Sequence, residues 1–147
     1  MNLKLKLNEA QMQREMATNL KNARLLVEAA MARRFLQITL LNLGNAGIDR
    51  PRPWKPLSPW YAKKVGRKIA TLILTGKLKS AIHIEDGNKV VVKNEDVSYA
   101  TDHQYGNAKK HLPARPYFPI KSDGTPTPWT ADELRIKAQE TINSIFS

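Results

Sequence analysis

The sequence contains no cysteine. Without thiols the chain cannot form disulfides, thiolate zinc sites or a cysteine nucleophile. No apolar run approaches the roughly 20 residues that a membrane-spanning helix needs. The first residues, MNLK, do not begin the long apolar stretch that a secretory signal requires. These absences predict a soluble protein that is made in a cytoplasm and has no membrane partner.

Catalytic motifs are also missing. None of the three histidines, His83, His103 and His111, occurs in the zinc-hydrolase helix pattern, and the glycines form no phosphate-binding loop. The pair Asp102 and His103 is compatible with a base and its orienting carboxylate, but no serine or cysteine nucleophile motif accompanies it. Carboxylates are few and scattered, which argues against a metal-dependent nuclease. The sequence therefore predicts no catalytic residue, no metal site and no cofactor, with a hydrolase using His103 as the alternative.

Acidic residues are scarce, and their scarcity is local. The chain has 24 Lys and Arg against 13 Asp and Glu, a net charge of +11, and the excess lies in residues 1–80, because residues 81–147 are close to neutral. No carboxylate occurs between Asp49 and Glu85. The basic residues of that block are Arg50, Arg52, Lys55, Lys63, Lys64, Arg67, Lys68, Lys77 and Lys79. Such a block predicts a polyanion or an acidic protein surface as partner, and a solvated face that aids solubility is the alternative.

The N-terminal third predicts a short strand and a long helix. Leu3, Leu5 and Leu7 alternate with polar residues, the pattern of a half-buried strand, and Asn8 offers a helix N-cap. From residue 9 to about residue 43 the apolar residues fall at helical spacing, and nothing breaks this segment before Gly44. We interpret the apolar stripe as core. It consists of Met12, Met16, Leu20, Ala23, Val27, Ala30 and Met31, extended by Phe35, Ile38 and Leu41.

A proline-rich segment follows at about residues 45–60. Proline removes backbone donors and restricts its neighbours, so this segment should be an extended arm. Trp54 and Trp60 are large apolar groups in an otherwise polar arm. They either dock the arm on the core or anchor it on another subunit. We expect the arm to pack mainly on a neighbouring subunit.

The remaining elements are short. Residues 59–67 predict a short helix, and residues 82–93 predict a β-hairpin that turns at Asp86 and Gly87. A closing amphipathic helix should begin near Trp129 and Thr130, where Thr130 and Glu133 fit a capping box. The chain is thus expected to form one α+β domain over residues 1–147. Its long N-terminal helix and its C-terminal helix should pack on a small, mostly antiparallel sheet.

Four sequence elements occur in a specific order: WKPLS at 54–58, ILTGKLKSAI at 73–82, YATDHQYG at 99–106 and PARPYF at 113–118. Together they resemble the phage virion morphogenesis family, the tail completion proteins of Mu-like and related tailed phages. The resemblance covers roughly residues 50–120. After Tyr117 the family pattern has a leucine and a glycine where this chain has Phe118 and Pro119, which leaves the subfamily and the phage type open.

The resemblance implies a structural role at the head–tail junction. Such a protein completes or terminates the tail and joins it to the filled head, as a ring around the DNA channel that we expect to be a hexamer. The implied partners are copies of itself, other neck, connector and tail-tube or terminator proteins, and the packaged DNA in passing. The implied location is the virion neck, with assembly in the host cytoplasm. The alternative is a non-specific DNA-binding protein that uses the basic N-terminal half.

The resemblance also suggests which residues make contacts. Candidates for subunit contacts are Trp54, Trp60, His103, Gln104, Arg115, Tyr117 and Phe118. Candidates facing the channel or DNA are Arg50, Arg52, Lys55, Lys63, Lys64, Arg67 and Lys68. Arg115 lies in a segment stiffened by prolines, which suits a subunit contact at low entropic cost. The alternative is that Arg115 pairs with a local carboxylate such as Asp102 or Asp96.

Overall fold

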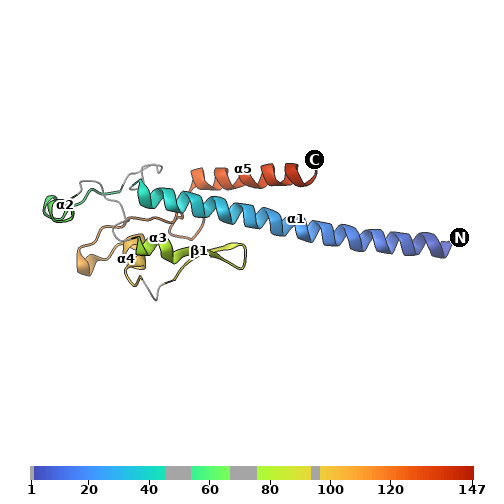
Figure 1. Ribbon diagram of the computed structural model, residues 1–147, viewed down its shortest axis with the longest axis horizontal. Coiled ribbons are helices and arrows are strands. Elements are labelled where there is room, and N and C mark those ends of the chain that lie inside the picture. The colour runs from blue at the N-terminus through green and yellow to red at the C-terminus, as the bar shows by residue number, and fades with distance from the viewer. Residues whose placement is uncertain (1, 46–53, 67–75, 94–96) are drawn as a thin grey trace.

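The computed structural model describes residues 2–45, 54–66, 76–93 and 97–147. Its elements in chain order are α1 (Asn2–Gly44), α2 (Pro59–Val65), α3 (Lys77–Ala81), β1 (Ile82–Glu85), β2 (Lys89–Val92), α4 (Ala100–Tyr105), the 3₁₀ turn η1 (Ala108–Lys110) and α5 (Pro128–Ile145). Figure 1 shows α1 as a long rod, with α5 beside it on one side, the hairpin, α3 and α4 on the other, and α2 beyond its C-terminal end. The α+β prediction is confirmed.

Helix α1 is longer than the sequence pattern indicated. It begins at Asn2, so the strand predicted around Leu3 to Leu7 is wrong, and Asn8 lies inside the helix instead of capping it. Leucine and lysine are good helix formers, and a helix that is already propagating extends at little cost. Three alternating leucines were too short a pattern to outweigh this tendency.

The apolar stripe of α1 is only partly core. Ala23, Ala30 and Ile38 in the second half are buried. Met12, Met16 and Leu20 in the first half are 60%, 62% and 62% exposed. The N-terminal part of α1 extends past the end of α5 (Figure 1), so no part of the described chain covers it. The prediction that the whole stripe is core is therefore wrong for its first half, and also for Leu41, which is 47% exposed.

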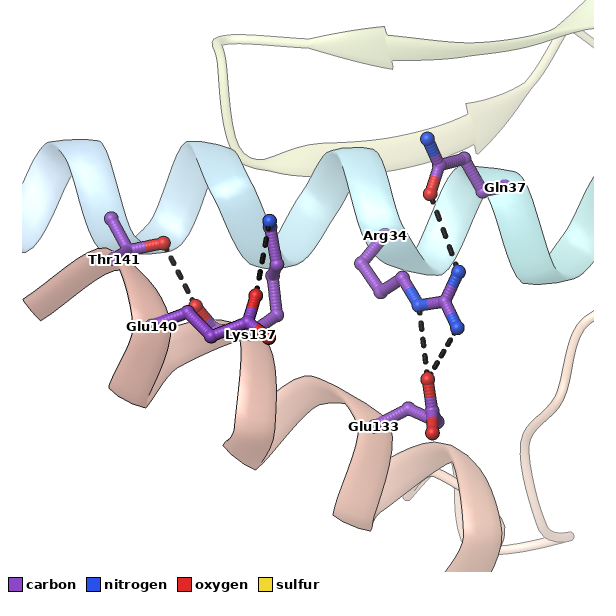
Figure 2. A network of polar contacts seen from close by, with 6 residues as sticks. All are labelled: Arg34, Gln37, Glu133, Lys137, Glu140 and Thr141. Atoms are coloured by element: carbon purple, nitrogen blue, oxygen red, sulfur yellow. Dashed lines mark hydrogen bonds and ion pairs between the residues drawn. The ribbon is translucent and has the colours of Figure 1, made fainter. Parts of the chain in front are cut away.

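Helix α5 packs antiparallel along α1 instead of on the sheet, while α1 itself contacts both strands. Thr127 occupies the N-cap position, and the buried Thr130 lies one turn inside the helix. The capping box predicted for Thr130 and Glu133 is therefore wrong. The Glu133 carboxylate instead accepts hydrogen bonds from Arg34 of α1, with Nε at 3.2 Å and Nη2 as the second donor (Figure 2).

The bond between Arg34 and Glu133 should contribute measurably to stability. Both side chains are about 70% buried, so Glu133→Gln, which removes the charge, should lower the free energy of unfolding by about 1–2 kcal/mol in urea denaturation. The matched control is Glu140→Gln, also on α5, whose exposed partner Lys137 lies at 3.3 Å (Figure 2). That change should cost no more than a few tenths of a kcal/mol, since exposed ion pairs are weak. Equal losses would contradict a special role for Glu133.

The hairpin is confirmed. Strands β1 and β2 pair antiparallel, with Ile82 opposite Val92 and Glu85 opposite Lys89. The turn has three residues, one more than the sequence signal suggested. Asp86 and Gly87 adopt positive φ values of 52° and 76°, the conformation for which Asp-Gly is favoured.

A single apolar cluster lies where the last turns of α1 meet the hairpin and the loops. Its buried members are Leu43, Trp54, Leu78, Ala81, Ile82, Val97, Ala100 and Tyr117. None of the helices in the described ranges combines the length and hydrophobicity needed to cross a bilayer.

Candidate functional site

The four sequence elements meet in the apolar cluster. Trp54 comes from the first element, Leu78, Ala81 and Ile82 from the second, Ala100 from the third and Tyr117 from the fourth. Residues up to 63 positions apart in the sequence therefore share one core. The ordered elements are first of all a structural unit, and the question is which of their side chains remain free for partners.

Gln104 joins the third element to the fourth. Its side chain is 5% exposed, and its Oε1 accepts hydrogen bonds from the backbone N–H groups of Tyr117 and Phe118, both at 3.0 Å. Its Nε2 donates to the carbonyl of Phe118 at 3.3 Å. The Gln104 amide thus pairs with the backbone of Tyr117 and Phe118 as a neighbouring β-strand would. Gln104 was a candidate for a subunit contact, but its hydrogen-bonding groups are used inside the chain.

Tyr117 is bonded through three of its groups. In addition to its N–H, its carbonyl accepts from Asn42 Nδ2 at 3.2 Å and its hydroxyl donates to the carbonyl of Ala100 at 3.3 Å. Burial raises the pKa of Tyr117 to about 12. Phe118 lies against Tyr117, with ring centroids 4.9 Å apart, and stacks on Phe35 of α1 at 6.0 Å. Tyr117 is therefore part of the core, and Phe118 is half-buried beside it.

Sequence reasoning missed Asn42. It is buried in the last full turn of α1, where its amide holds the carbonyl of Tyr117. The available signal was a polar residue between Leu41 and Leu43, at the end of an apolar stripe. A polar residue in such a place is informative, because buried polar groups are normally hydrogen-bonded.

Gly106 permits the close approach of the third and fourth elements. Its φ is 79°, and a Cβ built on it would lie 2.9 Å from the backbone nitrogen of Ala114. Any other residue would clash with the backbone there. Gly76, whose φ is 77°, adopts a left-handed backbone conformation as well.

Trp54 is a core residue. It is 7% exposed, and its Nε1 donates to the carbonyl of Pro116 at 3.2 Å. Trp54 therefore docks the end of the arm on the chain's own core, which favours the docking alternative, while its role as an anchor on another subunit stays a prediction. A bulky indole at the end of a proline-rich segment gains more by filling the chain's own core. The rest of the arm, residues 46–53 with Arg50 and Arg52, lies outside the described residues.

Arg115 is 7% exposed, and its Nε and Nη2 both donate to the carbonyl of Lys55 at 3.4 Å. It does not pair with Asp102, whose carboxylate binds Lys110 at 2.7 Å and Asn107 at 2.9 Å. Asp96 lies outside the described residues. Arg115 therefore ties the start of α2's segment to the fourth element, which leaves little of it for a subunit contact.

His103 does not form a catalytic pair. Its carbonyl accepts from the N–H of Arg115 at 2.7 Å, and its ring Nδ1 is buried and has no hydrogen-bond partner in the described chain. Burial, followed by the nearby Arg115 charge, lowers the pKa of His103, so the ring is neutral near pH 7. Asp102 is hydrogen-bonded to Asn107 and Lys110, so within the described ranges no carboxylate is bonded to this imidazole. Within the described ranges no group of three or more His, Asp and Glu is placed to hold a metal.

The free candidates lie on and beside α2. Trp60 is 71% exposed, and the Nζ of Lys64 lies 5.2 Å from its ring centroid, a cation–π contact. Lys55 and Lys63 are exposed as well. We call Lys55, Trp60, Lys63 and Lys64 the α2 surface. Arg67 and Lys68, which the sequence placed with them, lie outside the described residues.

Helix α2 is well formed although none of its residues is buried. Ser58 Oγ accepts from the N–H of Tyr61 at 3.3 Å, Pro59 occupies the first turn, and Gly66 ends the helix with a φ of 69°. In Figure 1, α2 lies apart from the other helices. Capping maintains a seven-residue helix, and among the described residues nothing buries its Trp60, Lys63 and Lys64 side chains.

Comparison with known proteins agrees with these features. The uncharacterized protein MJ0331 of Methanocaldococcus jannaschii is 42% identical over 73 residues, which cover 44% of this chain and 53% of that protein. The chain thus spans about half the length of this curated relative. No solved structure matches this chain. The model of the phage virion morphogenesis family matches residues 4–127, a range that includes all four sequence elements. This chain belongs to the phage virion morphogenesis family.

Proposed function

We propose that this protein is a structural component of the phage neck, which completes the tail and joins it to the head as a ring around the DNA channel. Membership of the family supports a structural role in virion morphogenesis. The role in the neck is supported by the contrast between the buried residues of the four elements and the exposed residues beside them. Their buried residues form a hydrogen-bonded core, and this core carries the exposed, basic and aromatic α2 surface.

The α2 surface suits a contact with a polyanion or with an acidic ring. Its three lysines lie on and beside a capped helix, and Trp60 adds a large apolar face. No carboxylate occurs in the sequence between Asp49 and Glu85, and none of the ion pairs among the described residues involves these three lysines. A positive wall without base-reading groups would let DNA pass without sequence preference.

Reversing the charge of the α2 surface tests its role. The triple variant Lys55→Glu, Lys63→Glu and Lys64→Glu should fold normally, because all three side chains are exposed, and should reduce the yield of DNA-retaining particles at least tenfold. The control is Lys93→Glu, Lys109→Glu and Lys121→Glu, which changes the net charge equally at exposed positions elsewhere. Particle yield would be measured by joining purified tails to heads in the presence of each variant.

Joining assays with empty heads distinguish between DNA and an acidic protein ring as the partner of the α2 surface. If it faces DNA, the triple variant should still join tails to empty heads and should fail only with filled ones. If it faces an acidic protein ring, joining to empty heads should fail as well. Absence of the wild-type protein from the necks of purified virions, tested by immunolabelling, would contradict the proposed function itself.

Non-specific DNA binding is the second candidate, favoured by the same exposed lysines. Its signature is the salt dependence of affinity, because each neutralised phosphate releases counterions. Three lysine contacts should give a slope of log K against log salt of about −3. A slope near zero, or no DNA binding by the free protein, would contradict the DNA-binding candidate and leave only the structural role.

A further inference from the structure

Two apolar surfaces of this chain are not filled by the rest of the described chain. The first is the α1 extension, residues 9–22, a segment about 21 Å long in the part of α1 that continues past the end of α5 (Figure 1). Met12, Met16 and Leu20 recur every four residues and so form one ridge along it. On the same face, small Ala30 lies next to Ile136 and Lys137 of α5. The ridge presents three large apolar side chains where α5 no longer accompanies α1, and no described part of the chain covers them.

The second surface is a groove of about 320 Å³ between α1, the hairpin and α5. Met31, Phe35, Val90 and Leu134 supply its apolar lining, with Glu28 and Asn88 at the polar rim. The α1 extension cannot enter the groove of its own chain, because Met12 and Met31 belong to one unbroken helix. Only another molecule can bring a ridge of this kind to the groove.

We propose that the α1 extension of one copy docks in the groove of a second copy, which makes a head-to-tail contact between subunits. A helix that inserts spaced apolar anchors into a groove is a recurring recognition mode, and methionine adapts well to such surfaces. Head-to-tail contacts close into rings when the rotation permits. The inference therefore rests on the proposed ring and names the surfaces that build it.

Electrostatics favours a second copy as the occupant. Each chain carries a net charge of +11, so two copies repel each other least where the surfaces that meet are neutral. The α1 extension is neutral, with Glu9 and Glu15 against Arg14 and Lys21. The groove rim is neutral too, because Glu28 pairs with Arg24 at 2.7 Å. A neutral extension is poorly suited to DNA or to an acidic ring, which the basic α2 surface would serve better.

The area involved suits a ring better than an isolated dimer. A helix segment of about 21 Å docked in a groove buries on the order of 1,000 Å² in total, near the lower limit for a specific interface. In a closed ring every chain makes two such contacts, one through its extension and one through its groove. Ring closure then makes the assembly more stable than each single contact.

Met16→Glu tests the extension. A carboxylate at the centre of the ridge should weaken self-association at least 30-fold in sedimentation experiments on the full chain, with an unchanged melting temperature, since Met16 is exposed. The control is Thr18→Glu, which adds the same charge at an exposed residue two positions along, on the opposite face of α1. It should alter self-association less than threefold. Unchanged assembly of Met16→Glu, or a wild-type chain that stays monomeric at every soluble concentration, overturns the proposal.

Mixing two variants tests the groove and the head-to-tail geometry. Met16→Glu has a disrupted extension and an intact groove, whereas Met31→Glu has an intact extension and a disrupted groove. Neither variant should therefore form rings alone. Their mixture should form 1:1 heterodimers, because one intact extension meets one intact groove. If Met31→Glu does not fold, Asn88→Trp at the exposed turn provides a second blocked groove. A mixture that stays monomeric overturns the proposal.

These outcomes are separable from failure of the neck function. Rings that survive in Met16→Glu overturn the docking contact while the protein can still be located in the neck. Conversely, heterodimers in the mixture support the contact even where labelling finds no protein in the neck. Joining defects of Met16→Glu with unchanged self-association would assign the extension to a tail protein and overturn docking on a second copy.

Discussion

Replacing Gln104 with leucine is expected to remove most of the stability of this domain. The substitution deprives the buried N–H groups of Tyr117 and Phe118 of their shared acceptor, whereas the Phe118 carbonyl keeps the N–H of Ile120 at 2.8 Å. Each buried group left unpaired costs about 1–3 kcal/mol. The total of about 3–5 kcal/mol is comparable with the whole stability of a small domain. Urea denaturation followed by circular dichroism would measure it.

The matched control is Gln139→Leu on α5. Gln139 is exposed, and its Nε2 donates only to Asn143 on the same helix, at 2.9 Å. This change should cost less than 0.5 kcal/mol, as is usual for surface substitutions. If both variants lose equally little, water can replace Gln104, and the loop of residues 113–118 is held chiefly by its aromatic packing.

The sequence predicted those elements whose signals are local. The hairpin follows from alternating apolar residues around Asp86 and Gly87, and α2 follows from Ser58, Pro59 and the residues up to Gly66. At the start of α1 the sequence pattern predicted a strand where the structure has a helix, because alternation and helix propensity indicate different elements there. There the outcome depends on propagation from the rest of the helix, which no short window shows.

The candidate site was harder to predict, because burial depends on long-range packing. Gln104, Arg115 and Tyr117 have the residue types found at interfaces, yet each is bonded within the chain. The ordered sequence elements identify the family equally well whether their residues hold the fold or bind partners. Conversely, periodicity cannot tell a ridge covered by α5 from one that projects beyond it, so Met12 and Met16 were assigned to the core.

Trp54→Ala should lower the stability of the fold, whereas Trp60→Ala should impair only assembly, although the two residues are just six positions apart. Trp54 is buried and bonded to the carbonyl of Pro116, so its truncation leaves a cavity in the core. A buried aromatic replaced by alanine costs about 3–5 kcal/mol. Trp54→Ala should therefore be unfolded or nearly so at 37 °C, with the loss visible in thermal denaturation of the isolated protein.

Trp60→Ala is the internal comparison. Its ring is mostly exposed and contacts Lys64, so the variant should keep the wild-type melting temperature within about 2 °C, as for other surface changes. Its defect should appear only when tails are joined to heads. Trp54→Phe adds a graded case, since it keeps most of the volume but loses the bond to Pro116, and should cost about 1–2 kcal/mol. A Trp54→Ala protein that melts normally but fails in assembly would reverse the assignment and return Trp54 to the subunit interface.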